Sequence, residues 1–213
     1  MRLVKIFNKR ILILKISEDY KKEIYRKSIH LSSLWMPALI YFAPSPYPQM
    51  LFLIMFIVDF MVEYFNYKGY KPAQKLFMLF SPTLRNKELQ HKKFTPTGSV
   101  YVLLSAFLCS FLFAKPIAVI ALSVMLISDT CAALVGKACG KHKIYRQKSW
   151  EGTFAFFASA IAVMLFLSPV YAFSAAGVLA CFMATLVELF EEPLKIDDNL
   201  SIPLIIAGVL TFL

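Results

Sequence analysis

The segment from Ser128 to Gly152 combines a carboxylate with glycines and lysines, a set of groups suited to phosphate chemistry. Asp129 lies about two-thirds of the way along an apolar stretch, 116–135, that is long enough to span a membrane. A carboxylate in a span costs about 2.5–3.5 kcal/mol, so it normally faces a partner or a polar cavity. The glycine- and lysine-rich residues 136–143 follow, and backbone N–H groups and lysines both favour an anion. The segment predicts a phosphate or nucleotide site, unless its lysines serve only to orient a cytoplasmic loop.

A second basic group opens the first apolar stretch. Arg26 and His30 are four residues apart and share one helical face, while Lys27 is turned by about 100°. These side chains could reach phosphates near the plane of the lipid headgroups. The alternative is a basic flank whose side chains extend along the membrane toward water.

Carboxylates at the ends of other apolar stretches add oxygen ligands. Asp129 and Glu188 are expected near the same membrane face, where they could hold a divalent cation, or one could accept a proton from a hydroxyl. The run 197–199 (Asp-Asp-Asn) offers further ligands at that face. The alternatives are a structural pair satisfied by lysine and a solvated turn. Asp59 and Glu63, four residues apart, are expected to have a structural role by pairing with a basic residue.

The composition predicts the elements that would position these residues. The 213-residue chain is 59% hydrophobic and 17% charged, with a mean hydropathy of +0.64, which indicates a polytopic membrane protein. We expect an all-α fold with an interfacial amphipathic helix over 1–22 and one transmembrane catalytic domain over 23–213. About seven spans are expected, over 24–43, 49–67, 97–114, 116–135, 152–167, 171–190 and 200–213.

The distribution of basic residues predicts the orientation. With the N-terminus inside, the segments 1–29, 67–97, 136–151 and 190–199 are cytoplasmic and hold 22 of the 23 lysines and arginines. The candidate residues then all lie at the cytoplasmic face of a bacterial-type inner membrane. Because the basic residues flank apolar stretches, we expect them to bind anionic lipid headgroups and nucleotide phosphates and not nucleic acid, despite the net charge of +10.

The chain contains no P-loop, no Gly-x-Ser-x-Gly sequence and no His-Glu-x-x-His sequence. It resembles the integral-membrane lipid kinases that include dolichol kinase, phytol kinase and CTP-dependent diacylglycerol kinase, whose bacterial relatives are often labelled phosphatidate cytidylyltransferase. The resemblance covers the chain from Arg26 onward. It rests on blocks in this order: Arg26-Lys27-x-x-His30, Leu84-Arg85-x-x-Glu88, Thr97-Gly98, Ser128-Asp129-Thr130-x-Ala132, Gly136-x-x-x-Gly140, Lys148-Ser149-x-Glu151-Gly152-Thr153, Glu188, and Asp197-Asp198-Asn199-Leu200-x-Ile202-Pro203.

The resemblance implies Mg²⁺-dependent transfer of the γ-phosphoryl group of a nucleoside triphosphate, usually CTP, to the hydroxyl of a lipid alcohol such as diacylglycerol or a polyprenol. It implies three sets of residues. The catalytic set is Asp129, Lys148, Glu151, Arg26, Lys27 and His30. The nucleotide-binding set is Gly136, Gly140, Lys148, Ser149, Gly152 and Arg85. The metal-binding set is Asp129, Glu188, Asp198 and Asn199.

One position departs from the family pattern, because Glu63 stands near an expected arginine. Two other functions were weighed. A cytidylyltransferase that makes CDP-diacylglycerol would use the same nucleotide at a similar interface. A small ion-coupled transporter would use Asp129 and Glu188 as a relay, and it predicts internal symmetry, of which the sequence shows no trace.

Overall fold

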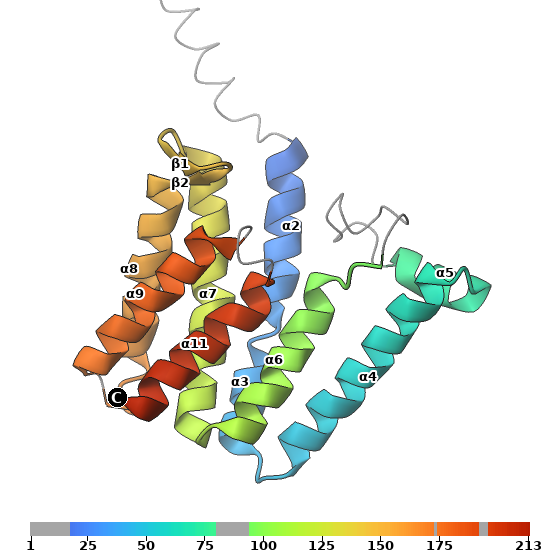
Figure 1. Cartoon of the computed structure of the whole chain (residues 1–213), viewed down its shortest axis with the longest axis horizontal. Helices are drawn as coiled ribbons and strands as arrows, with labels where there is room; N and C mark the ends of the chain where they lie inside the picture. Colours follow the sequence, from blue (N-terminus) through green and yellow to red (C-terminus); the bar gives the residue numbers. More distant parts are fainter. Residues whose placement is uncertain (1–17, 80–93, 173, 192–195) are drawn as a thin grey trace, which may run out of the picture.

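We describe the protein from a computed structural model, which describes residues 18–79, 94–172, 174–191 and 196–213 (Figure 1). Most of the expected amphipathic helix over 1–22 and the whole of Leu84-Arg85-x-x-Glu88 lie outside these residues. The described part is mostly helical. It contains α2 (Glu18–Ser32), α3 (Trp35–Phe42), α4 (Tyr47–Tyr67), α5 (Lys71–Leu79), α6 (Gly98–Leu112), α7 (Lys115–Cys139), α8 (Trp150–Phe166), α9 (Ala175–Leu189) and α11 (Asp198–Phe212), with a hairpin of β1 (Lys143–Tyr145) and β2 (Lys148–Ser149).

Helix α7 is the centre of the bundle. It contacts α2, α3, α6, α8 and α11, and every residue from Ile117 to Leu126 is buried. A helix that is covered on all sides needs apolar residues all round, which explains why this stretch has no polar stripe. Asp129 follows the fully apolar part and is therefore held in the interior at one end of the bundle.

The helices support a membrane protein, with two candidate spans among the described residues. Helices α4 and α7 are long and apolar enough to cross a membrane, while α6, α8, α9 and α11 are apolar but have 15–17 residues. At 1.5 Å per residue a 15-residue helix is about 22 Å long, shorter than a hydrocarbon core of about 30 Å. Seven full-length spans therefore remain a prediction.

The first expected span, 24–43, is broken into α2 and α3. Pro37 lacks the N–H that would bond to the carbonyl of Ser33, and its ring clashes with that carbonyl in a continuous helix. The Ser33 carbonyl instead accepts from the Met36 N–H at 2.9 Å, a tighter turn at the break. The break leaves Arg26, Lys27 and His30 together on α2.

The fourth expected span continues further than 135. Helix α7 extends through Gly136 to Cys139, so Gly136 is helical and does not belong to a loop as expected. The antiparallel hairpin follows, and it was not expected either, because its strands have only three and two residues. It turns the chain back so that β2 leads directly into α8.

Asp59 and Glu63 hold the start of α6. Glu63 accepts hydrogen bonds from the backbone N–H of Thr97, at 2.9 Å, and from the Thr97 hydroxyl, while Asp59 accepts from the Ser99 hydroxyl at 2.8 Å. Carboxylates are favourable at a helix N-terminus. These contacts give the pair a structural role at the start of α6, while the expected pairing with a basic residue stays a prediction.

Candidate active site

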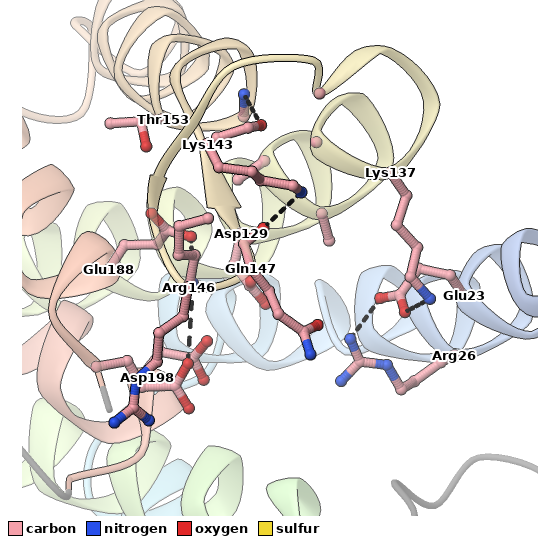
Figure 2. Close-up of a pocket in the computed structure, with 18 residues that line it drawn as sticks. Glu23, Arg26, Asp129, Lys137, Lys143, Arg146, Gln147, Thr153, Glu188 and Asp198 are labelled. Carbon is pink, nitrogen blue, oxygen red and sulfur yellow. Dashed lines mark hydrogen bonds and ion pairs between the residues drawn. The ribbon is translucent and has the colours of Figure 1, made fainter. Parts of the chain in front are cut away.

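A cavity of about 580 Å³ lies where several helices meet at one end of the bundle (Figure 2). It is lined by residues of α2, the end of α7, the hairpin, the start of α8, the end of α9 and the start of α11. Ligand pockets typically have about 300–1,000 Å³, so a nucleotide-sized molecule fits this volume. The expected convergence of Arg26, Asp129, Lys148 and Glu188 on one face is found here, since all four line the cavity.

The lining is rich in charges of both signs. The basic side chains are those of Arg26, Lys137, Lys143, Arg146 and Lys148, and the acidic ones are those of Glu23, Asp129, Glu188, Glu191 and Asp198. Lysines and arginines in a partly enclosed cavity favour an anion such as a polyphosphate.

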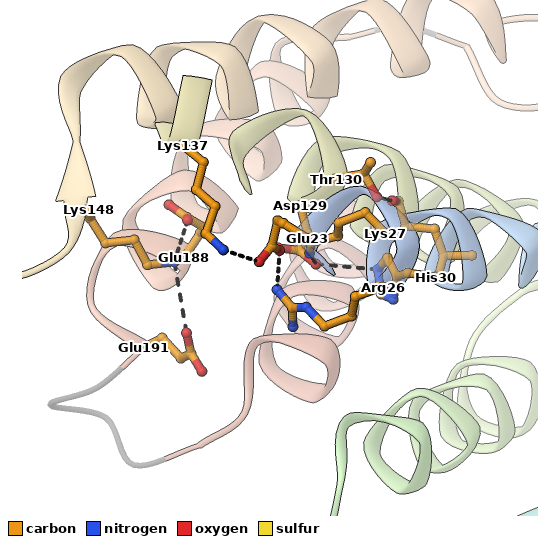
Figure 3. A network of polar contacts seen from close by, with 11 residues as sticks. Glu23, Arg26, Lys27, His30, Asp129, Thr130, Lys137, Lys148, Glu188 and Glu191 are labelled. Atoms are coloured by element: carbon orange, nitrogen blue, oxygen red, sulfur yellow. Dashed lines mark hydrogen bonds and ion pairs between the residues drawn. The ribbon is translucent and has the colours of Figure 1, made fainter. Parts of the chain in front are cut away.

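Asp129 is held by two residues of α2. Lys27 donates a hydrogen bond to Oδ2 of Asp129, and Nε2 of His30 lies 3.3 Å from the same oxygen (Figure 3). Asp129 and Lys27 are buried, with exposures of 6% and 3%. Neither Lys27 nor His30 lines the cavity, so either could influence a molecule bound there only through its contact with Asp129.

Lys148 on β2 is held by carboxylates at the end of α9. Its Nζ donates to Oε1 of Glu188 and lies 3.8 Å from Oε2 of Glu191 (Figure 3). Burial alone would lower the pKa of Lys148, but the nearby carboxylates of Glu188, Asp198 and Glu191 outweigh it and raise that pKa above its ordinary value. Lys148 is therefore a cation at any physiological pH.

Glu23 links α2 to the end of α7. It accepts from Arg26 one turn along α2 and from Lys137 of α7 at 2.8 Å. Sequence analysis missed Glu23 and Lys137 as cavity residues. The available signal was the spacing of Glu23 and Arg26, three residues apart on one helical face.

The glycines of the predicted nucleotide loop serve close packing. A Cβ on Gly140 would lie 2.2 Å from the carbonyl oxygen of Gly136, and a Cβ on Gly152 would lie 3.0 Å from that of Ala132. Ser149 lies among them and caps α8, its hydroxyl accepting from the Gly152 N–H at 3.3 Å. These three glycines and Ser149 also line the cavity, so their predicted contact with a nucleotide stays open to test.

Besides Lys27 and His30, two predicted site residues in the described part of the chain, Glu151 and Asn199, do not line the cavity. Glu151 pairs with His142, its Oε1 lying 2.8 Å from Nδ1, and Asn199 donates from Nδ2 to Oδ1 of Asp197 at 2.7 Å. Arg85 lies outside the described residues. The predicted roles of Glu151 in catalysis and of Arg85 in nucleotide binding stay predictions.

The hairpin contributes lining residues that the sequence analysis did not select. Lys143, Arg146 and Gln147 lie on or beside its turn, and Thr153 lies in the first turn of α8. Arg146 has a positive φ of 48°, which suits a tight turn. The hairpin is too short to give an alternating pattern in the sequence, so these side chains could not be assigned to the site beforehand.

Oxygen atoms suited to a divalent cation are present beside the cavity. Within the described part of the chain, Oε2 of Glu188 and Oδ1 of Asn199 are buried without a hydrogen-bond partner. Mg²⁺ prefers carboxylate and amide oxygens, and a buried oxygen without a partner is costly. The donor set near Glu188 and Asp198 therefore fits the metal ion that was expected.

Comparisons with known proteins assign the chain to a family. A family model described as the cytidylyltransferase family matches residues 11–195. The uncharacterized protein RP860 of Rickettsia prowazekii (strain Madrid E) is 31% identical over 191 residues, which cover 88% of this chain and 93% of that relative. The uncharacterized protein MJ1137 of Methanocaldococcus jannaschii is 31% identical over 193 residues, covering 89% and 93%. No solved structure gives a significant match.

Proposed function

Because the chain belongs to the cytidylyltransferase family, we propose that it is a CTP-dependent lipid kinase of the cytoplasmic leaflet of a bacterial-type inner membrane. It transfers a phosphoryl group to a lipid alcohol such as diacylglycerol or a polyprenol. The observation that carries this proposal is a buried carboxylate, Asp129, that faces a cation-lined cavity at one end of an apolar helical bundle.

The cations account for nucleotide binding. Lys148, Lys137 and Arg26 line the cavity near its carboxylates, and Lys143 and Arg146 line it from the hairpin. Triphosphate oxygens would replace the carboxylates as partners of some of these side chains. Because the lining also holds five carboxylates, these cations and a divalent cation together would balance the charge of the triphosphate.

Asp129 is placed to act as the base. It takes the proton of the lipid hydroxyl as the hydroxyl oxygen bonds to the γ-phosphorus, and the bond between that phosphorus and the bridging oxygen to the β-phosphorus breaks, so that CDP leaves. Lys27 and His30 orient the carboxylate, while Lys148 and Arg26 neutralise charge on the phosphates. Phosphoryl transfer needs positioning and charge neutralisation above all.

A divalent cation is part of the proposal. The expected ligands are among Asp129, Glu188, Asp198 and Asn199, and the ion would neutralise charge on the transferring phosphoryl group. Glu188 and Asp198 line the cavity where the phosphates are expected, and Asn199 lies next to Asp198.

The position of the cavity suits a lipid substrate. It opens at the end of the bundle, while large apolar side chains are exposed along α4, α8 and α9. A lipid tail can stay in the hydrocarbon as its hydroxyl reaches the interface, and CTP arrives from the cytoplasm. Anionic headgroups would contact the basic residues around the cavity mouth.

The second candidate is a phosphatidate cytidylyltransferase, which the name of the matching family favours. In that reaction a phosphate oxygen of phosphatidate attacks the α-phosphorus of CTP and pyrophosphate leaves. The two reactions share the nucleotide and differ in the bond that breaks.

The position of a radiolabel distinguishes them. We expect purified protein in mixed micelles to transfer label from [γ-³²P]CTP, and not from [α-³²P]CTP, to diacylglycerol or a polyprenol. Transfer of α-label to phosphatidate would establish the cytidylyltransferase instead. No lipid labelling with either nucleotide across a panel of diacylglycerol, polyprenol, phytol and phosphatidate would contradict both reactions.

A further inference from the structure

Three carboxylates meet at the junction of α9 and α11. One oxygen from each of Glu191, Asp197 and Asp198 lies within 4.8 Å of the others. Oxygens on opposite sides of an ion are about 4.2 Å apart for Mg²⁺ and about 4.8 Å apart for Ca²⁺, twice the usual bond lengths. The three oxygens are thus near enough together to share one divalent cation.

Two buried oxygens beside these carboxylates point to a ligand. Asn199 is 4% exposed and donates from Nδ2 to Oδ1 of Asp197, so its Oδ1, on the same carbon as Nδ2, is held next to the cluster without a hydrogen-bond partner. Glu188 is 3% exposed, and its Oε2 also has no hydrogen-bond partner. The hydrogen bonds among these residues therefore leave Oδ1 of Asn199 and Oε2 of Glu188 unsatisfied.

Two carboxylates at the junction are also close to Lys148. The ammonium of Lys148 binds Glu188 and lies 3.8 Å from Glu191, so these two carboxylates already share one positive charge (Figure 3). Asp198 lines the same cavity. Carboxylates at close range repel one another, and a divalent ion together with the basic side chains of the lining would reduce that repulsion.

Asp129 is in a different environment. Its Oδ2 is bound by the Lys27 ammonium and lies 3.3 Å from His30 Nε2. A metal ion at that oxygen would face a buried ammonium at close range, which is electrostatically unfavourable. The carboxylate that faces the lipid hydroxyl and the carboxylates that hold a metal are therefore separate groups.

We propose that Glu191, Asp197 and Asp198, with the buried oxygens of Glu188 and Asn199 beside them, form the divalent-cation site, and that Asp129 is not a metal ligand. This inference refines the metal-binding part of the proposed function and excludes one of its four expected ligands. It adds Glu191, which was not predicted from the sequence, and Asp197, which belongs to the run of possible oxygen ligands but not to the metal-binding set that the resemblance implies.

Direct binding of Mn²⁺ to the detergent-purified full chain, without nucleotide or lipid, tests the proposal through the electron paramagnetic resonance signal of free Mn²⁺. We expect Glu191→Gln and Asp197→Asn each to weaken Mn²⁺ binding by about tenfold or more, since even residues around metal ligands affect affinity by about 10–100-fold. Asparagine at 197 keeps an oxygen that can cap α11. Asp129→Asn and the control Asp59→Asn, in the α4–α6 contact, should bind Mn²⁺ like the wild type.

Two results would overturn the proposal. One is Mn²⁺ binding that falls in Asp129→Asn but not in Glu191→Gln or Asp197→Asn, in variants whose circular dichroism matches the wild type. The other is wild-type protein that binds no Mn²⁺ above the level of the Glu191→Gln, Asp197→Asn double variant, as expected if Arg146 neutralises the carboxylates. Because the assay contains no CTP, its outcome is independent of whether the protein is a kinase or a cytidylyltransferase.

Discussion

At the scale of single residues, the environment of Asp129 separates its two predicted roles. A metal ion would compete with the Lys27 ammonium for Oδ2 of Asp129. A base, in contrast, benefits from neighbours that fix its orientation. Lys27 and His30 were expected to contact phosphates directly, but they lie behind Asp129 and outside the cavity lining. A contribution from these two residues to phosphate binding would therefore pass through Asp129.

Asp129→Asn tests the role of this carboxylate. We expect lipid phosphorylation to fall by about 10²–10⁴-fold, because an amide cannot accept the hydroxyl proton. The amide is nearly isosteric, so the protein should still insert into membranes and elute as the wild type in size-exclusion chromatography. Activity in the radiolabel assay close to the wild-type rate would contradict a base at this position, and Asp59→Asn serves as the control for loss of a half-buried carboxylate elsewhere.

At the scale of elements, glycines let the hairpin and the first turn of α8 pack closely against α7, because a glycine has no side chain to keep the backbones apart. Gly140 caps the C-terminus of α7 and lies against the Ser149 hydroxyl, and Gly152 lets α8 approach the backbone of Ala132. The same approach brings Lys148 next to Glu188. The glycine pattern that suggested a phosphate-binding loop therefore positions Lys148, the proposed phosphate contact, through backbone packing.

Gly140→Ala should disturb this packing. Its Cβ would lie 2.2 Å from a backbone oxygen that cannot move without bending α7, so we expect a loss of about 1–3 kcal/mol and a lower apparent Tm in detergent. Gly208→Ala, inside α11 where nothing lies within 4 Å of the new Cβ, is the matched control and should be neutral or stabilising by about 0.5–1 kcal/mol. Equal Tm values for the two variants would show that the contact at Gly140 is unimportant.

At the scale of the whole molecule, groups that are far apart in sequence meet at one end of the bundle. The hairpin, the end of α7 and the start of α8 lie together there, and α4 with α5 forms the opposite side of the molecule (Figure 1). Lys115, the basic residue outside the predicted cytoplasmic segments, donates to the carbonyls of Tyr41 and Ala43 at the other end. This separation agrees with the predicted orientation, which a labelling experiment can test.

Cys139 reports the side of the membrane that holds the cavity. It is exposed at the end of α7, whereas Cys109 and Cys181 are buried. In a variant that keeps Cys139 alone, we expect a membrane-impermeant maleimide to label inside-out vesicles and not intact spheroplasts. A further variant whose single cysteine comes from Ser168→Cys, in the exposed turn after α8, should show the reverse. Labelling of Cys139 in spheroplasts would reverse the orientation.

The sequence by itself determined the helical class, the approximate position of most helices, and the gathering of charged residues at one face. These features follow from local patterns, namely apolar runs of limited length and basic residues at their ends. The break at Pro37 was readable in principle from the chemistry of proline, although the expected first span passed through it.

The tertiary structure alone decided which charges are partners. Lys27 and Asp129 are 102 residues apart and Lys148 and Glu188 are 40 apart, and no periodic pattern connects them. The hairpin, the packing role of the glycines and the position of Glu191 beside Asp197 likewise depend on how helices pack. Hydrophobic periodicity predicts which residues are buried. It does not predict how the helices are rotated and spaced relative to one another, and that packing geometry decides which polar atoms meet.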